Sequence, residues 1–384
     1  MLKCHAAVRA AGLALALLVL LEPMLFAGQA ADKIFQKGAV KPLLVRITAE
    51  SIDGIKAGSA EFNPIGIARI EYADSPHSFN EGVEHHKLGR YEEAIRFFEA
   101  AFRSDARVVR HFWLHPACRY YIALCYLEDG SDLAAAEAKF RELLTNHPTT
   151  RWLPEAMLGL GRVQFEAKKY DGALTEFEQL SAKAVQKNWE EWLYRSYLWK
   201  GRTLLEKKDH PAALASVRKI TEAAAGNPRY KDIVIQAKVI EATIHVRSGD
   251  YKRAAGQLRA LIKEIGPAVG KEIEGGTDSR MRRTEAQCYN ALGHCFLKQA
   301  AQTKKEDDYR EALLAFLWTV VMHQRLPAEH AEALNYGATC FEKLKDRSRA
   351  TQLRNELAER YPDSPYVRKL GTPGTAASKK ENAK

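Results

Sequence analysis

The sequence lacks the short motifs that mark most enzyme active sites. It has no G-x-S-x-G elbow, no Walker A loop, no G-x-G-x-x-G that opens a helix after a strand, and no C-x-x-C pair. Each of these motifs holds a nucleophile, a phosphate group or a redox pair in a defined turn. We therefore expect no enzyme and no catalytic, cofactor-binding or metal-binding residues. An enzyme built from scattered catalytic groups is the third-ranked interpretation.

The segment closest to a metal motif is residues 111–118. His111 and His115 are four residues apart and Cys118 follows three residues later, a spacing that could place two ligands on one side of a helix. Pro116 interrupts the segment, and no carboxylate completes a zinc signature such as H-E-x-x-H. We expect structural or solvent-exposed histidines here.

Cysteine is scarce and does not form an even set. Of six cysteines, Cys4 lies within the first thirty residues, which we expect to be removed as described below. Five cysteines then remain, an odd number for any disulfide framework. Two pairs are separated by seven residues, which is about 10.5 Å along a helix and exceeds the roughly 7 Å that a disulfide allows between Cα atoms. We therefore expect buried thiols at Cys118, Cys125, Cys288, Cys295 and Cys340.

Long apolar runs are absent after the first thirty residues. Residues 10–21 read AAGLALALLVLL, follow two positive charges, and end at Glu22 and Pro23 before small residues. This pattern predicts a signal peptide over residues 1–30, cleaved after Ala30. The alternative is an uncleaved anchor. No later segment approaches the roughly 20 apolar residues of a membrane span, so we expect an exported protein that is soluble or peripheral to a membrane.

The charge balance is basic but not concentrated. The formal net charge is +10, the isoelectric point is about 9.2, and there is no arginine-rich block. Such a balance suits nucleic acid, anionic lipid, anionic envelope polymers or an acidic protein. Because we expect export, we predict no nucleic-acid partner, and peripheral membrane association stays open.

Residues 32–73 differ in pattern from the rest of the chain. The stretches LLVRITAESIDGIKAG and IGIARIEYA are rich in valine and isoleucine, and Asp53-Gly54 is a hairpin signal between short runs. They predict a small β module that packs against the first helices, because it is too short to hold a large core alone.

At the C-terminal end of the chain, residues 370–384 have no apolar pattern and predict a disordered basic tail.

A repeated pattern fills residues 78–365. A glycine or alanine in one predicted helix is followed twelve residues later by an alanine in the next, and the best copies add a tyrosine before and a phenylalanine after that alanine. Small residues let two antiparallel helices approach closely, while the aromatic rings fill the gap to the neighbouring pair. The clearest pairs are Gly82–Ala94, Gly161–Ala173, Gly201–Ala213, Ala242–Ala254 and Ala338–Ala350.

These repeats resemble the tetratricopeptide repeat (TPR), most clearly in GRYEEAIRFFEAA, KKYDGALTEFEQL and GDYKRAAGQLRAL. The resemblance implies an all-α TPR-type α-solenoid, a right-handed superhelix of about six to seven helix pairs, with the small β module at its N-terminus. The helix endings His147-Pro148 and Tyr361-Pro362 resemble those of bacterial cell-envelope TPR proteins. Together with the predicted signal peptide, that likeness implies a location in the periplasm or on the outer surface of a bacterium.

In TPR arrays resembling this one, the first helix of each pair lines a concave groove, and the residue after the small residue faces into it. Two neighbouring pairs carry arginines there, and guanidinium groups bind carboxylate or phosphate by paired hydrogen bonds. The alternative is that the arginines pair with acids of the chain, such as Glu155, Glu166 and Glu206. The resemblance therefore implies that six residues bind a ligand in the groove: Arg162, Arg195, Arg202, Asn290, His294 and Asn335.

The function that we expect is an exported scaffold or adaptor in the cell envelope. It would mediate protein–protein interactions by holding an extended or acidic partner segment in the groove. A homo-oligomer stays open, since exposed ends of solenoids often pair. The second-ranked interpretation is an envelope protein that binds an anionic polymer or a carbohydrate through its basic surface.

Overall fold

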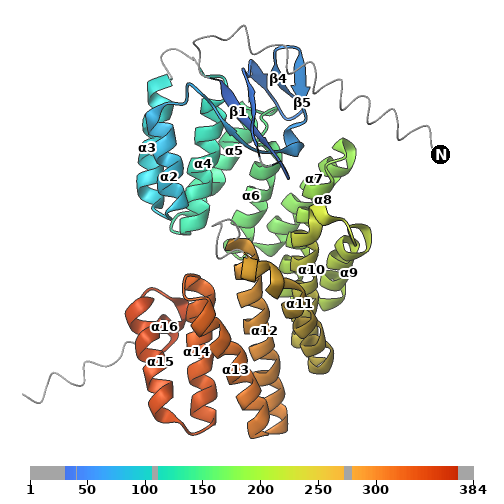
Figure 1. Cartoon of the computed structure of the whole chain (residues 1–384), viewed down its shortest axis with the longest axis vertical. Coiled ribbons are helices and arrows are strands. Elements are labelled where there is room, and N and C mark those ends of the chain that lie inside the picture. Colours follow the sequence, from blue (N-terminus) through green and yellow to red (C-terminus); the bar gives the residue numbers. More distant parts are fainter. Residues whose placement is uncertain (1–30, 40, 106–110, 272–278, 371–384) are drawn as a thin grey trace, which may run out of the picture. The chain divides into compact units, whose positions relative to one another are not determined.

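Helices make up most of the structure (Figure 1). The computed structural model describes residues 31–39, 41–105, 111–271 and 279–370. Within these residues, six strands precede fifteen α-helices, and the chain divides into two compact units between Ala167 and Lys168. No described helix offers the continuous apolar length that crossing a membrane requires. The predicted fold class, a helical repeat array after a small β module, is confirmed.

Two predictions concern parts of the chain without a described structure. The predicted signal peptide, residues 1–30, lies outside the described residues, and so does the predicted tail after Leu370. The helical part itself continues to Leu370, five residues past the predicted end at Pro365.

The β module consists of two small antiparallel sheets. In one, β1 (Asp32–Gln36) lies between β2 (Leu43–Val45) and β6 (Ile67–Glu71); in the other, β4 (Ile55–Ala57) lies between β3 (Ala49–Glu50) and β5 (Ala60–Phe62). A short 3-10 helix, Pro64–Gly66, precedes β6. Glu50 pairs with Ile55 across the turn that contains Asp53 and Gly54, so the predicted hairpin is confirmed. The core of the module is a cluster of isoleucines: Ile34, Ile47, Ile55 and Ile67.

The first unit contains the β module and five helices. These are α2 (His77–Lys87), α3 (Tyr91–Asp105), α4 (Leu114–Asp129), α5 (Leu133–Asn146) and α6 (Leu153–Glu166). Their ends follow ordinary capping rules. For example, α4 ends at Gly130 in the left-handed conformation (φ +72°), and the Asp132 carboxylate accepts a hydrogen bond from the Ala135 amide at the start of α5.

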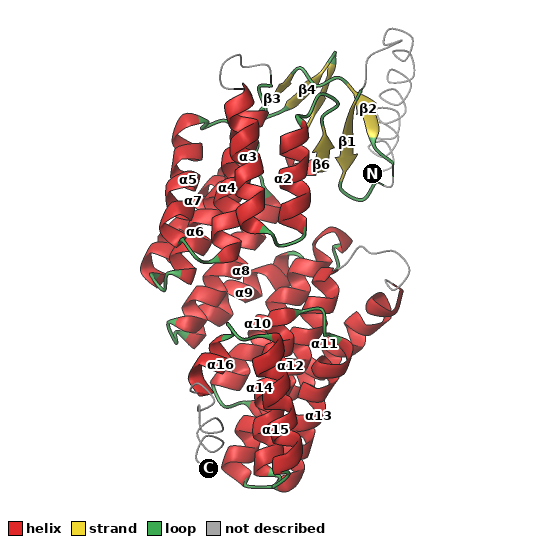
Figure 2. Ribbon diagram, turned by 90° about the vertical axis from the view of Figure 1, so that its left-hand side faces the viewer, coloured by secondary structure: helices red, strands yellow, loops and turns green. Residues whose placement is uncertain are grey.

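The β module packs on these helices, as predicted. The Tyr72 ring stacks on Trp113 with 3.9 Å between ring centroids, and the Tyr72 hydroxyl donates a hydrogen bond to Glu50. Arg151, just before α6, lies 3.2 Å from the same buried carboxylate. Figure 2 shows β6 beside α2 on this side of the unit. The stack of Tyr72 on Trp113 and the ion pair of Glu50 with Arg151 therefore attach the module to the helices of this unit.

The second unit is entirely helical in its described residues. Its helices are α7 (Tyr170–Lys187), α8 (Glu190–Glu206), α9 (His210–Ala223), α10 (Lys231–Arg247), α11 (Tyr251–Lys271), α12 (Ser279–Thr303), α13 (Glu306–Met322), α14 (Pro327–Lys343), α15 (Arg347–Arg360) and α16 (Pro365–Leu370). A 3-10 turn, Pro228–Tyr230, precedes α10. Asp209 and Asp346 cap the starts of α9 and α15 as Asp132 caps α5.

Small residues allow close approach within the helix pairs. A Cβ added at Gly82 would lie 2.7 Å from the Phe98 ring, and one added at Gly293 would lie 2.6 Å from the Phe316 ring. Atoms cannot approach that closely, so each glycine is required by the ring packed against it. The predicted role of the small residues is confirmed. The two phenylalanines pack within their own pair and also contact the next one, where Phe98 stacks on Tyr121 and Phe316 on Tyr336.

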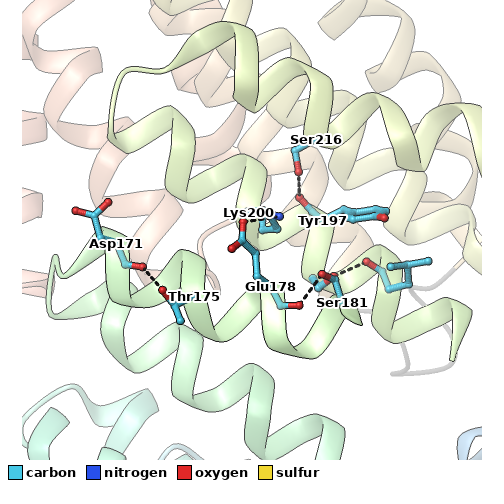
Figure 3. Close-up of polar contacts among 9 residues, drawn as sticks. Asp171, Thr175, Glu178, Ser181, Tyr197, Lys200 and Ser216 are labelled. Atoms are coloured by element: carbon cyan, nitrogen blue, oxygen red, sulfur yellow. Dashed lines mark hydrogen bonds and ion pairs between the residues drawn. The ribbon is translucent and has the colours of Figure 1, made fainter. Parts of the chain in front are cut away.

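Polar contacts also join consecutive helices of the second unit (Figure 3). Ser216 on α9 donates a hydrogen bond to the Tyr197 carbonyl on α8 at 2.9 Å. Lys200 on α8 donates to the exposed Glu178 carboxylate on α7 at 3.1 Å. The buried serine bond contributes to the packing of α8 and α9, whereas the exposed ion pair adds little stability.

Candidate functional site

A cavity of about 570 Å³ lies in the second unit between α12, α14 and the segment that joins α15 to α16. Its size is within the roughly 300–1,000 Å³ of typical ligand sites. α12 contributes Gln287, α14 contributes Glu329 and Glu332, and the α15–α16 segment contributes Tyr361 and Tyr366. The lining thus combines carboxylates from successive turns of α14 with aromatic side chains from the α15–α16 segment.

The sequence around Pro362 builds one wall of this cavity. Proline cannot continue a helix, so α15 ends at Arg360 and α16 begins at Pro365. The Tyr366 amide donates to the Ser364 hydroxyl at 3.3 Å, which supports the turn. Side chains of α16, including Val367, pack on an apolar cluster around Leu334 and Leu357. The short helix is therefore held against α14 by apolar burial.

Glu332 is the centre of a hydrogen-bond network between α12 and α14. Its Oε1 atom lies 2.9 Å from Nε2 of His294, and its Oε2 atom accepts a bond of 2.8 Å from the Asn290 side-chain amide. The same amide nitrogen donates to the Glu329 carbonyl at 2.9 Å. Tyr336, one turn after Glu332, lies edge-on to His294 with 4.4 Å between ring centroids. These contacts hold the carboxylate in one orientation at the cavity wall.

The network keeps Glu332 ionised. Burial alone would raise its pKa, but the hydrogen bond and charge of His294 and the hydrogen bond from Asn290 together lower the pKa below the ordinary value. The phenol of Tyr366 shows the opposite effect, since burial and then the negative charge of Glu332 raise its pKa. At neutral pH the cavity therefore contains a carboxylate beside a neutral phenol.

Glu329 is more deeply buried than Glu332, with 7% of its surface exposed. Its Oε1 atom accepts a hydrogen bond of 3.1 Å from Gln287 and lies 3.5 Å from the guanidinium of Arg283. Among the described residues, no donor reaches its Oε2 atom. Glu329 also lies in the first turn of α14, where the helix dipole favours a negative charge.

The structure brings together two of the predicted site residues, Asn290 and His294, on Glu332. Asn290 is 2% exposed, so it positions this carboxylate and the backbone of α14. Asn335, half-buried on α14, accepts a hydrogen bond from Thr339 through its backbone carbonyl. We predicted that the side-chain amides of Asn290 and Asn335 donate hydrogen bonds to a ligand. The amide of Asn290 instead donates within the protein.

The predicted arginines lie elsewhere. Arg162 is on α6 in the first unit, whereas Arg195 and Arg202 are on α8 in the second. Arg195 donates to Glu191 at 2.9 Å, an acid outside the three predicted as possible partners of the arginines. The Arg202 guanidinium lies over the Trp199 ring, 4.8 Å from its centroid. Binding of an acidic segment by these arginines stays a prediction.

Sequence reasoning missed Gln287 and Glu332, which line the cavity. A step of seven residues back along the helix connects Arg202 to Arg195, and both are predicted groove residues. The same step connects His294 to Gln287 and Thr339 to Glu332. Applied to every repeat, that spacing would have identified both cavity residues.

The cysteines and histidines occupy structural positions. All five described cysteines are free and buried, which confirms the predicted buried thiols. His111 lies 3.6 Å from Asp74, and His115 packs against the Phe102 ring at 4.4 Å between ring centroids. Within the described part of the chain, no group of three histidine, cysteine or acidic residues is placed to hold a metal ion.

Two family models, both described as tetratricopeptide repeat, match residues 79–150 and 155–184. No curated protein is significantly similar to this chain in sequence. The matched residues are therefore tetratricopeptide repeats, and the helical array around them is of the same type.

Several solved structures are similar to this chain, and the match with a TM-score above 0.5 supports the fold. The apo form of RapI is 12% identical with a TM-score of 0.52, over 76% of this chain and 98% of RapI. A tetratricopeptide repeat protein from Parabacteroides merdae is 13% identical with a TM-score of 0.49, over 76% of this chain and 95% of that one. The apo quorum sensor NprR from B. thuringiensis is 14% identical with a TM-score of 0.49, over 76% and 77%. At these identities, the similarity to RapI shows a shared fold and nothing more.

Proposed function

We propose that the protein is an exported TPR scaffold that binds an extended segment of a partner protein in the cavity between α12, α14 and α16. The observation that carries the proposal is the cavity itself. It is lined by aromatic side chains of the α15–α16 segment and by carboxylates of α14, of which Glu332 is held by Asn290 and His294. Concave sites with a few oriented polar groups and apolar walls are typical of ligand recognition. No cofactor is required for this role.

The export part of the proposal rests on the first thirty residues of the sequence. Two positive charges, an apolar run and a small-residue end are the pattern of a signal peptide. An exported scaffold would meet its partner in the bacterial cell envelope. The basic net charge of +10 suits an envelope that contains anionic components.

Site-specific photocrosslinking tests the binding site. Ala328 is exposed at the start of α14 and lines the cavity. The protein should therefore fold with a photoreactive phenylalanine at this position, and that side chain should contact the bound segment. The control is the same residue at Gly256 on α11, which is exposed and has no side chain within 4 Å of its Cβ position.

In cells of a bacterial host that contain the partner, we expect a discrete crosslinked protein from position 328 and none from position 256. The Ala328→Trp variant, whose indole would fill the mouth of the cavity, should lose the same partner in a pull-down. Equal crosslinking from both positions, or a partner retained by Ala328→Trp, would contradict binding in the cavity.

A further inference from the structure

Two buried acceptor atoms beside the cavity have no hydrogen-bond donor among the described residues. They are Oε2 of Glu329 and Oδ1 of Asn290, on side chains that are 7% and 2% exposed. A buried acceptor without a partner is unfavourable, and for a charged group the cost is larger. Because Asn290 donates to the Glu329 carbonyl, the two residues are immediate neighbours. The site is short of donors, not of acceptors.

The charges that surround these acceptors are mainly negative. Glu329, Glu332 and Asp363 line the cavity, and Arg360 is the cation among the lining residues. The Arg360 guanidinium is already engaged, since it donates to Glu356 at 2.8 Å and to the Gln324 carbonyl at 3.4 Å. Outside the lining, Arg283 approaches Glu329 only through Oε1, and His294 is paired with Glu332.

The remaining walls suit the carbon stem of a long cationic side chain. Tyr361 and Tyr366 contribute aromatic rings, and Pro327, Pro362 and Pro365 contribute apolar edges. Lysine and arginine bury their methylene groups along apolar surface while the charged head contacts polar groups. A guanidinium also packs well on an aromatic face.

We infer that this cavity binds an arginine or lysine side chain of the partner segment, with its charged head on Glu329 and Glu332. The inference rests on the proposed function, of which it specifies the ligand chemistry. The head group supplies a donor to Glu329, a lining residue whose Oε2 atom lacks one, and its charge offsets those of the two carboxylates. The partner segment is therefore basic at this position, in contrast to the acidic segment predicted for the arginines of α6 and α8.

An immobilised positional-scanning library of decapeptides tests this ligand class on the whole protein. The peptides that bind best should share an arginine or lysine at one position. Replacement of that arginine by citrulline keeps the shape and removes the charge. We expect this change to weaken binding by about ten- to hundredfold, the loss of charge-assisted hydrogen bonds. Glu329→Gln and Glu332→Gln should weaken binding of the arginine peptide, while Glu178→Gln, on α7, should not.

The results separate the inference from the proposed function. If citrulline and arginine peptides bind the wild-type protein equally, the inference is wrong, whatever the variants do, and this comparison does not depend on any variant folding. If peptides bind without a basic preference and Ala328→Trp abolishes their binding, the cavity is a peptide site of another specificity. If no peptide binds, or Ala328→Trp changes nothing, both the inference and the proposed binding site are wrong.

Discussion

At the scale of single residues, Glu332 links stability to the candidate site. The carboxylate is held by His294 on α12 and Asn290 on the same helix, and these contacts lower its pKa. A group whose pKa is lower in the folded than in the unfolded state stabilises the fold above its unfolded pKa, about 4.3 for glutamate. That stabilisation disappears as the pH falls through the lowered pKa of the folded state.

We therefore expect the free energy of unfolding of the wild-type protein to fall more steeply on acidification than that of Glu332→Gln. The difference should appear between about pH 5 and pH 3, where the folded and unfolded states take up protons unequally. Urea titrations at each pH measure it. Glu178→Gln, which removes one partner of an exposed ion pair with Lys200, is the matched control and should follow the wild type. Parallel curves for Glu332→Gln and the wild type would show that the network does not stabilise the ionised form.

At the scale of elements, the glycines of the first helices set the distance between paired helices. Gly293→Ala would push a methyl group against the Phe316 ring, which lies 2.6 Å from the added Cβ. We expect a loss of about 1–3 kcal/mol in stability from this overpacking. Gly256→Ala on α11 is the control, because nothing beyond its chain neighbours and the backbone of its own helix lies within 4 Å of its Cβ position. There the better helix propensity of alanine should stabilise the protein by up to about 1 kcal/mol.

Both changes are measured by chemical unfolding followed by circular dichroism. If Gly293→Ala were as stable as Gly256→Ala, the close approach of α12 and α13 would not be set by this glycine.

The same elements show how far sequence reasoning reaches. The close approach of paired helices at small residues and the hairpin at Asp53-Gly54 were predictable, because these residues are close in sequence and follow local rules of spacing and turn geometry. The contacts of Glu332 with Asn290 and His294 span about forty residues and depend on how α12 and α14 align. A helical period alone does not determine that alignment. The helix α16 was missed because a proline-rich ending is as compatible with a chain end as with a new helix.

At the scale of the whole molecule, the described cysteines of both units share one state. All five are buried, and burial raises the pKa of Cys125, Cys288 and Cys340 to about 12 and that of Cys295 to about 11. The thiolate is the reactive form, so these thiols are protected both by burial and by protonation. None of the described cysteines forms a disulfide, so the described fold is held by packing and not by covalent links.

This state predicts a simple reaction pattern for a Cys4→Ser protein, in which only the described thiols remain. In native buffer, an aromatic disulfide reagent should react with them only as slowly as the protein opens, and in guanidinium chloride all five should react at once. A reductant should leave Tm unchanged. Fast reaction of one thiol in the folded protein would identify a repeat that opens locally, and its position, found by peptide mapping, would show which helix pair is least stable. A Tm lowered by reductant would contradict this prediction, because it would show that an oxidised cysteine pair contributes to the fold.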